Sequence, residues 1–460
     1  MAALKRNPRR WSAAAVALLL AAALCGCAAP PVGGPAPAFE QAPADDSTLI
    51  VVAVEDTPEA MPGAGATPRS AYAGGAGYAG STRAAALSAA LAREHGLHEQ
   101  AFWSIAPLKL RCMLFRIAAG SERAAVLAQL GRDPRVRLAQ PLNSFDTLAL
   151  PAVPAVPAVP AIAAGERYND PYVGLQRGFA AIDAAQAQRW SRGDGVRVAL
   201  IDSGVDGSHP DLEGRIASQR DFVAGDRPPA AGGERHGTEV AGVIAAAANN
   251  RIGIVGVAPQ ARLLAYRACW PVAGGGSRCD TFTLAQALGA AIAADADIIN
   301  LSLGGPADPL LQRLAEYAIK RGTIVVGALP PGGRVDGFPA GVAGVLVVGS
   351  SDETGLARSV LSAPGRDILT LAPGGHYGYA SGSSLAAAHV SGAVALLRTL
   401  SPGLRAETVQ ALLERAPQPA NTNTNTNTNT NTPVDVCSAV RRLRAAAACG
   451  QREPAAPLRD

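Results

Sequence analysis

The sequence predicts an α/β domain built on a parallel sheet with helices on both faces, preceded by a small α+β domain. Three observations lead to this prediction. The chain has 460 residues, more than one hydrophobic core usually serves. A proline- and alanine-rich stretch near its first third separates two parts with different patterns. In the second part, continuous apolar runs alternate with helical stretches, as strands buried on both faces do.

The first 27 residues are typical of an export signal. Basic residues precede an apolar run over 11–24, which is too short to span a bilayer. The run ends in Leu24-Cys25-Gly26-Cys27, which resembles a bacterial lipobox and makes Cys27 the candidate for acylation. A plain signal peptide cut nearby is the alternative. We expect an exported protein, periplasmic or held at the outer membrane as a lipoprotein.

A small domain is expected over residues 48–147, after a flexible linker at 28–47. Its predicted elements are a strand at 48–54, a helix at 83–94, an extended pair within 102–117, a helix at 122–130 and a strand at 136–142. The order βαββαβ is that of a ferredoxin-like domain. Residues 148–167 repeat Pro-Ala-Val and are expected to form an extended spacer between the domains.

The larger domain is expected over residues 168–415. Its predicted strands are residues 196–201, 263–267, 298–303, 323–329, 345–348 and 368–371. These runs separate helical stretches, which favours a parallel sheet covered on both faces. Residues 416–460 hold an Asn-Thr repeat and a short helix-like end, and a repeat of that composition cannot bury a core.

Charge and cysteine usage narrow the biochemical class. The net charge of +4 is small and the arginines are scattered, so no nucleic-acid partner is expected. Export implies an oxidising compartment, where cysteines form disulfides. Of the seven cysteines, five remain once Cys25 and Cys27 are set aside. Short local loops favour two pairings, Cys269 with Cys279 and Cys437 with Cys449, and leave Cys112 unpaired.

Three polar residues lie where predicted strands end or helices begin. Asp202 ends a buried strand, His236 begins a helix rich in small residues, and Ser384 lies at another helix N-terminus. Taken singly, each has an ordinary structural explanation: a turn former, a surface imidazole and a helix cap. Together, an acid, an imidazole and a hydroxyl are the groups that acyl transfer needs.

The segments around these three residues resemble the subtilisin family in order and spacing, over about residues 168–415. This resemblance implies a serine endopeptidase that uses Asp202, His236 and Ser384 as its catalytic triad and acts on proteins or peptides. Residues 48–146 are similar in layout to the family's propeptide, which aids folding and then inhibits. If the junction is cut, a lipid on Cys27 stays with the propeptide and the peptidase can leave the membrane.

Further residues follow from the same resemblance. Ser302, Leu303 and Gly304 match the strand that pairs with the substrate backbone. Gly337 matches the floor of the main specificity pocket, which then has room for a large apolar side chain. The side chains of Asp211 and Asn250 match ligands of a structural calcium site, although the Asn-rich stretch could also be only a turn.

The sequence departs from the family pattern at one position that bears on catalysis. Pro331 stands where the family has an Asn whose side chain donates to the oxyanion, and proline offers no donor. Glu239 replaces a second His and Ala388 replaces a Pro, at positions without a proton-transfer role. Losing the oxyanion donor weakens an enzyme less than losing the nucleophile. We therefore expect a peptidase, and the alternative is a catalytically silent peptide-binding lipoprotein.

Overall fold

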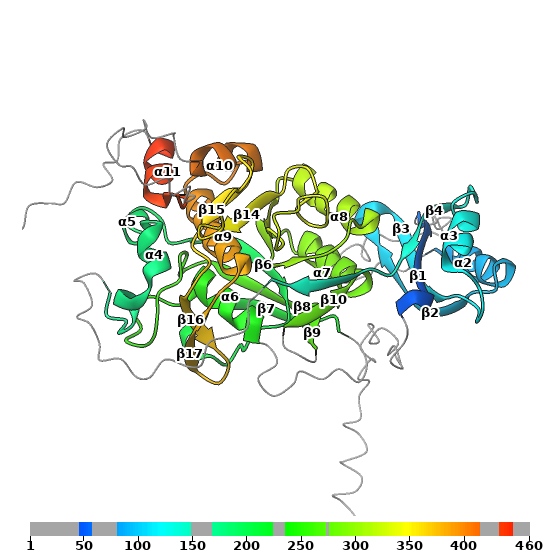
Figure 1. Ribbon diagram of the computed structural model, residues 1–460, viewed down its shortest axis with the longest axis horizontal. Coiled ribbons are helices and arrows are strands. Elements are labelled where there is room, and N and C mark those ends of the chain that lie inside the picture. Colours follow the sequence, from blue (N-terminus) through cyan, green and yellow to red (C-terminus); the bar gives the residue numbers. More distant parts are fainter. Residues whose placement is uncertain are drawn as a thin grey trace, which may run out of the picture.

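The computed structural model describes residues 46–57, 81–148, 168–223, 235–272, 276–414 and 432–444. They form a small lobe and a large lobe (Figure 1). The predicted signal segment, with Cys27, lies outside the described residues, as does Cys449. Within the described ranges, no helix is long and apolar enough to cross a membrane.

The small lobe is an antiparallel sheet with two helices on one face, in the predicted order βαββαβ. The strands lie side by side in the order β2-β3-β1-β4. Its elements are η1 (Asp46–Thr48), β1 (Leu49–Glu55), α2 (Thr82–Glu94), β2 (His98–Ile105), η2 (Ala106–Leu108), β3 (Leu110–Arg116), α3 (Arg123–Leu130) and β4 (Val136–Pro141). Ser81 begins α2 as an N-cap, its Oγ accepting from the Ala84 N–H at 3.1 Å.

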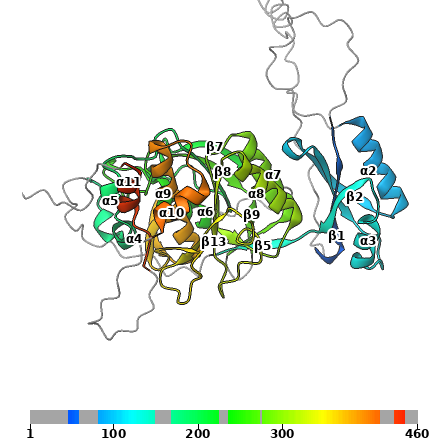
Figure 2. The same ribbon diagram turned by 90° about the horizontal axis from the view of Figure 1, so that it is seen from above.

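Strand β1 is buried on both of its faces, which explains its uninterrupted apolar sequence. Ile50, Val52 and Val54 pack with residues of α2 and α3. The alternate residues, such as Val51, belong to the core that includes helices α7 and α8 of the large lobe. The small lobe therefore presents an apolar sheet face to the large lobe, and Figure 2 shows it beside these two helices.

The large lobe is built on a seven-stranded sheet in the order β15-β14-β13-β11-β6-β8-β7, with every neighbouring pair parallel. Its strands are β6 (Arg197–Asp202), β7 (Ile216–Asp221), β8 (Arg262–Arg267), β11 (Ile298–Leu301), β13 (Ile324–Ala328), β14 (Leu346–Ser350) and β15 (Leu361–Ala363). Five of them overlap the predicted strands.

Helices cover both faces of this sheet. One face packs on α6 (Arg235–Ala245) and α9 (Ser383–Leu400), and the other packs on α7 (Thr281–Ala293) and α8 (Pro309–Lys320). Alternate residues of each strand enter different cores: Leu200 faces the first pair of helices and Ile201 the second. The predicted α/β class is confirmed, and Figure 1 shows the layers.

Shorter elements complete the lobe and do not enter the sheet. They are η3 (Val173–Leu175), α4 (Arg177–Ala181), α5 (Ala184–Ala187), η4 (Pro210–Leu212), α10 (Ala406–Leu413) and α11 (Val436–Leu443). Helix α11 packs against α5, α9 and α10, so the described part of the C-terminal segment rests on the large lobe.

One predicted strand lies outside the parallel sheet. β16 (Ile368–Ala372) instead forms an antiparallel hairpin with β17 (His376–Ala380). Gly374 and Gly375 have φ of 80° and 76°, a conformation that glycine adopts readily, and they reverse the chain directly after β16. The edge strand β7 was not predicted, because its sequence is largely polar and exposed.

The end of the small-lobe segment becomes a strand of the large lobe. β5 (Ser144–Thr147) lies between β12 (Leu303–Gly304) and β10 (Ser277–Asp280), in a sheet ordered β12-β5-β10-β9. β9 (Cys269–Pro271) and β10 form a hairpin, and β5 is antiparallel to both of its neighbours. The sequence suggested only a domain boundary here. Figure 2 shows β5 reaching from the small lobe into the large one.

Candidate active site

The three predicted catalytic residues come from three different elements of the large lobe. Asp202 is the last residue of β6, His236 the second residue of α6, and Ser384 the second residue of α9. Helices α6 and α9 pack against each other. All three residues are buried, with 1%, 6% and 0% of their surface exposed respectively.

Asp202 and His236 form a direct hydrogen bond, with Nδ1 and Oδ1 2.7 Å apart. An ionised carboxylate only accepts, so Nδ1 carries the proton and Nε2 is left as the basic nitrogen. Among the described residues, His236 Nε2 and Ser384 Oγ are two of the few buried side-chain atoms without a hydrogen-bond partner. Buried polar atoms are rarely left unpaired, so these two atoms, next to the Asp202–His236 bond and at the start of α9, are candidates for the reacting groups.

The electrostatics around His236 favour its charged form. Burial by itself lowers the pKa of His236, but the charge of Asp202, its hydrogen bond and the charge of Glu239 outweigh burial, so the pKa is raised. Glu239 is buried on the next turn of α6 and pairs with Arg235 at 2.8 Å. Burial raises the pKa of Glu239 above its usual range.

Gly237 lets α6 begin close to the strand that carries the aspartate. A Cβ at this position would lie 1.9 Å from the carbonyl oxygen of Gly204 and 3.4 Å from Cβ of Asp202. The Gly237 N–H also donates to Ser203 Oγ at 3.2 Å. Only glycine permits this approach, which brings His236 within reach of Asp202.

The predicted substrate-binding strand is occupied by the chain itself. β12 pairs with β5, Leu303 opposite Thr147 and Gly304 opposite Asp146. The Leu148 N–H donates to the Ser302 carbonyl at 3.2 Å, and the Ser384 N–H donates to the Leu148 carbonyl at 3.5 Å. An extended backbone therefore lies in the groove with one carbonyl group turned toward the N-terminus of α9.

A second contact couples this groove to the helix of Ser384. Ser302 Oγ donates to the main-chain carbonyl of Ser384 at 3.1 Å, and it accepts from Asn300 Nδ2 at 2.9 Å. Ser302 thus binds Leu148 through its backbone and Ser384 through its side chain. Ser302 therefore fixes the backbone of Leu148 relative to the start of α9.

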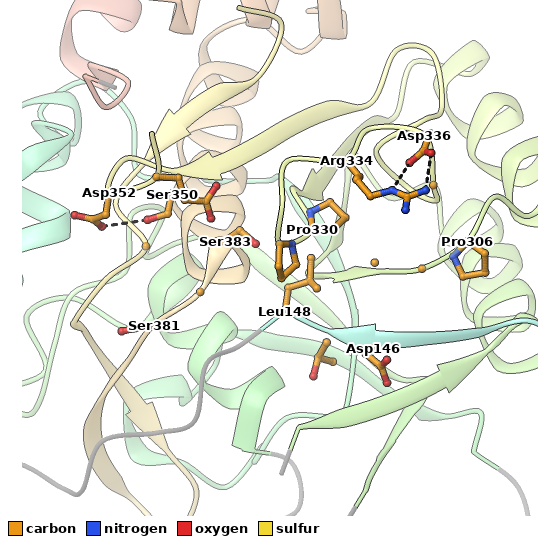
Figure 3. A pocket seen from close by; sticks show the side chains of 18 of the residues that line it. Asp146, Leu148, Pro306, Pro330, Arg334, Asp336, Ser350, Asp352, Ser381 and Ser383 are labelled. Carbon is orange, nitrogen blue, oxygen red and sulfur yellow. Dashed lines mark hydrogen bonds and ion pairs between the residues drawn. The ribbon is translucent and has the colours of Figure 1, made fainter. Parts of the chain in front are cut away.

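A cavity of about 860 Å³ opens beside Leu148. Figure 3 shows Leu148 next to Pro330, between the Ser350–Asp352 hydrogen bond and the Arg334–Asp336 ion pair. Pro331 also lines this cavity. Neither proline has an N–H group to donate to the Leu148 carbonyl, which accepts from the Ser384 N–H.

Gly337, predicted as the floor of the specificity pocket, lines the same cavity, and the structure adds a reason for the missing side chain. A Cβ on Gly337 would lie 2.1 Å from the Gly305 carbonyl oxygen. Gly305 in turn donates its N–H to the Phe338 carbonyl at 3.0 Å. The glycine therefore allows two segments of backbone to meet.

The residues expected to bind calcium are met by hydrogen-bond donors. Asp211 accepts from Asn250 Nδ2 at 2.7 Å and from the Ile254 N–H at 2.9 Å. The Tyr377 hydroxyl also bonds to this carboxylate; burial and then the charge of Asp211 raise the pKa of Tyr377. Calcium needs six to eight oxygen ligands. As they lie, these side chains do not fit the ion, and hydrogen bonds satisfy Asp211 in its place.

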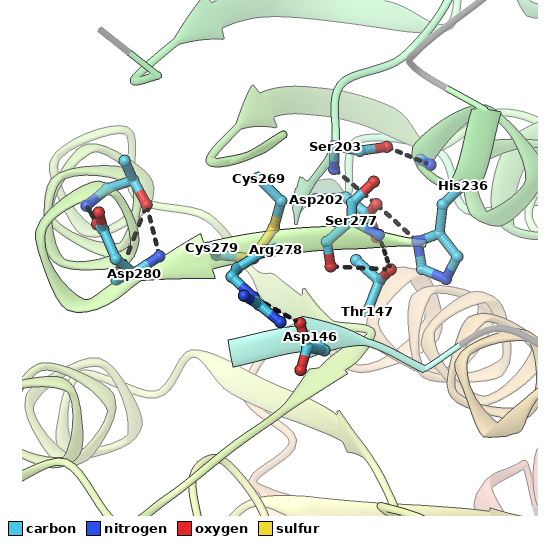
Figure 4. The surroundings of a disulfide bond; sticks show 12 residues. Asp146, Thr147, Asp202, Ser203, His236, Cys269, Ser277, Arg278, Cys279 and Asp280 are labelled. Atoms are coloured by element: carbon cyan, nitrogen blue, oxygen red, sulfur yellow. Dashed lines mark hydrogen bonds and ion pairs between the residues drawn. A yellow bond between two sulfur atoms is a disulfide. The ribbon is translucent and has the colours of Figure 1, made fainter. Parts of the chain in front are cut away.

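The cysteines follow the expected pattern where they are described. Cys269 and Cys279 form a disulfide, as predicted, which joins β9 to β10 (Figure 4). Cys112 is free and buried in the sheet of the small lobe. Cys437 is disulfide-bonded, and its predicted partner Cys449 lies outside the described residues.

Sequence reasoning missed the residues of β10, which contact β5 on the side opposite to β12. Ser277 and Arg278 of β10 contact Thr147 and Asp146, at distances of 3.1 Å in both cases. No motif marks them, because the contacts depend on β5 crossing from one lobe to the other. The pairing of Cys269 with Cys279 was the only available signal that this loop has a fixed shape.

Comparison with known proteins identifies the family. The model described as the subtilase family of peptidases matches residues 193–433. The chain belongs to the subtilase family. Thermitase from Thermoactinomyces vulgaris is 37% identical over 259 residues, 54% of this chain and 90% of thermitase. Subtilisin E from Bacillus subtilis is 37% identical over 224 residues, 46% of this chain and 57% of that protein.

These relatives are serine proteases, and this subtilase is accordingly a serine endopeptidase that acts on proteins or peptides. The silent peptide-binding alternative is not favoured. The crystal structure of fervidolysin from Fervidobacterium pennivorans is similar to this structure, with a TM-score of 0.64 and 23% identity. The similarity covers 86% of this chain and 61% of the fervidolysin chain. At that identity the likeness bears on the fold alone.

Proposed function

We propose that Asp202, His236 and Ser384 hydrolyse peptide bonds as a catalytic triad through an acyl-enzyme. His236 Nε2 takes the proton of Ser384 Oγ as the oxygen attacks the substrate carbonyl, and later gives it to the leaving amine. Asp202 holds the ring by its Nδ1–H and stabilises the imidazolium. The 2.7 Å bond between Asp202 and His236 and the unpaired Nε2 and Oγ atoms support these roles.

The observation that carries the proposal is the position of Leu148. Its carbonyl oxygen accepts from the Ser384 N–H, at the N-terminus of an 18-residue helix where the dipole favours negative charge. A peptide bound in this way presents to Ser384 the carbonyl group of the residue at the Leu148 position. We infer that Leu148 occupies the site of the residue before the cleaved bond.

Residues 48–148 then act as a propeptide that inhibits the enzyme before it is cut. The segment blocks the groove with β5, and the sheet of the small lobe packs on α7 and α8. The proposed first cleavage is the peptide bond between Leu148 and Ala149. This cut leaves the signal segment and any lipid on Cys27 with the propeptide, so an exported, anchored precursor yields a peptidase that can leave the membrane.

The proposed preference for an apolar side chain before the cleaved bond rests on the surroundings of Leu148. Gly304 and Pro330 flank it: a Cβ on Gly304 would lie 3.4 Å from Leu148 Cδ1 and 3.0 Å from Pro330 Cγ. The cavity continues past this slot to Gly337. A larger apolar side chain therefore also has room.

A serine-directed test separates this function from silent peptide binding. The wild-type chain should react with a fluorophosphonate probe once processed, and its intact mass should show a cut after Leu148. Ser384→Ala should fold, since shortening a helix-start serine costs about 0.5–2 kcal/mol, yet stay uncut and unlabelled. Ser383→Ala is the matched control, because it removes the neighbouring hydroxyl and should still be labelled. A wild type that is neither cut nor labelled would refute the proposal.

A further inference from the structure

The β9–β10 hairpin forms one wall of the groove. It contacts side chains of β5, the strand that lies in the groove. Arg278 lies opposite Asp146 and Cys279 opposite Phe145 in the ladder between β10 and β5. Cys279 is tied to Cys269 by the disulfide, one residue away from Arg278. The wall is therefore held in shape at the point where it meets the strand (Figure 4).

Thr147, the residue before Leu148, is bound through its hydroxyl. Its Oγ1 accepts from the Ser277 N–H at 3.1 Å and donates to the Ser277 carbonyl at 3.4 Å. Both residues are buried, with 8% and 6% of their surface exposed. One atom, Oγ1, both donates and accepts here, as the hydroxyl of Thr or Ser can. Valine has the same shape but would leave buried polar groups of Ser277 without this partner.

Asp146, one position earlier, is bound through its charge. Its Oδ1 lies 3.1 Å from Nε of Arg278, and the two side chains are 61% and 45% exposed. Exposed ion pairs contribute little and are screened by salt. This contact should therefore discriminate between charges only modestly, and less so as the salt concentration rises.

We propose that the groove selects substrates with Thr or Ser immediately before the residue at the cleaved bond, and an acidic residue one position earlier. The main chain of Ser277 reads the hydroxyl and the side chain of Arg278 reads the charge. This rests on the proposed peptidase function and specifies the substrates of the same site. Proteins carrying an acidic residue, a hydroxyl residue and an apolar residue in succession form the expected substrate class.

The test uses the processed wild-type enzyme and fluorogenic amides of Phe-Asp-Thr-Leu and its variants. Replacing Thr by Val should lower kcat/KM by about 10- to 100-fold, while Ser should remain within a few-fold of Thr. Replacing Asp by Lys should lower kcat/KM by about two- to five-fold, and high salt should remove that difference but not the first. Equal kcat/KM for the Thr and Val peptides would overturn the reading of the hydroxyl.

Charge reversal isolates the second contact. In Arg278→Glu the Lys peptide should be cleaved faster than the Asp peptide, while the ratio between the Thr and Val peptides stays as in wild type. An unchanged preference for Asp over Lys in Arg278→Glu would overturn the role of that side chain.

A measurement on the uncut chain keeps the inference separate from catalysis. If no peptide is cleaved and no chain is processed, the proposed function fails, but the groove contacts can still be tested in Ser384→Ala. There, adding Thr147→Val should speed hydrogen exchange at the Ser277 amide by about ten-fold relative to adding Thr147→Ser. Equal exchange in the two chains would overturn the Thr147 contact whatever the activity.

Discussion

Replacing Gly237 by Ala should disable the enzyme by moving its histidine. The added Cβ would lie 1.9 Å from the Gly204 carbonyl oxygen, whereas real Cβ contacts stay beyond 3.0 Å. Either the start of α6 or the strand end must shift by about 1 Å, and His236 is the adjoining residue. A misplacement of about 1 Å in a catalytic group can cost about 10²-fold in rate. Forcing an atom into a packed site costs about 1–3 kcal/mol of stability.

The assay compares the rate of the cut after Leu148 and the urea unfolding midpoint in Gly237→Ala and in Gly289→Ala. Gly289 is a helical glycine on α7 where a Cβ would meet nothing within 4 Å. Alanine there should leave the cut rate unchanged and add about 0.5–1 kcal/mol of stability. The reasoning is refuted if Gly237→Ala is processed at the wild-type rate and unfolds at the same urea concentration.

Three further outcomes follow from the site. Pro331→Asn should raise kcat by up to about 10²- to 10³-fold if its amide reaches the oxyanion, and an active wild type that does not respond already has a second donor. Glu239→Gln removes a negative charge that raises the pKa of His236, so that pKa should fall and the acidic limb of the kcat/KM profile should move to lower pH; a move to higher pH would contradict this. Calcium and a chelator should leave the thermal midpoint unchanged, while Tyr377→Phe should cost about 1–3 kcal/mol because Asp211 loses a buried hydrogen bond; stabilisation by calcium would show that the ion does bind.

The strands that could be predicted from the sequence are those whose pattern of apolar residues follows from their own burial. The strand ending in Asp202 is apolar over 198–201 and the strand at 324–328 over its whole length, because helices cover both faces, and this continuity identified them. The polar edge strand β7 has no such pattern. β16 has the sequence of a buried sheet strand. Its own residues do not show that the turn at Gly374 and Gly375 pairs it with β17 in an antiparallel hairpin.

The candidate site was predictable where function requires particular residue types in a fixed order. Asp202, His236 and Ser384 were predicted in this way, and the structure places Asp202 Oδ1 and His236 Nδ1 2.7 Å apart. Contacts that join distant segments were not found. The placement of β5 against Arg278 involves residues 132 positions apart, and the contact of Tyr377 with Asp211 depends on the β16–β17 hairpin.

If the proposed cut after Leu148 is made, the two-part attachment of residues 48–148 to the large lobe changes character. Before the cut, β5 is tethered to the enzyme and meets the groove at a high effective concentration that dilution cannot alter. Afterwards β5 and the sheet face of the small lobe would belong to a separate molecule, held by the contacts in the groove and on α7 and α8. On the proposed function, inhibition would then follow the law of mass action, so a high concentration of the processed protein would favour the inhibited complex and dilution would release active enzyme.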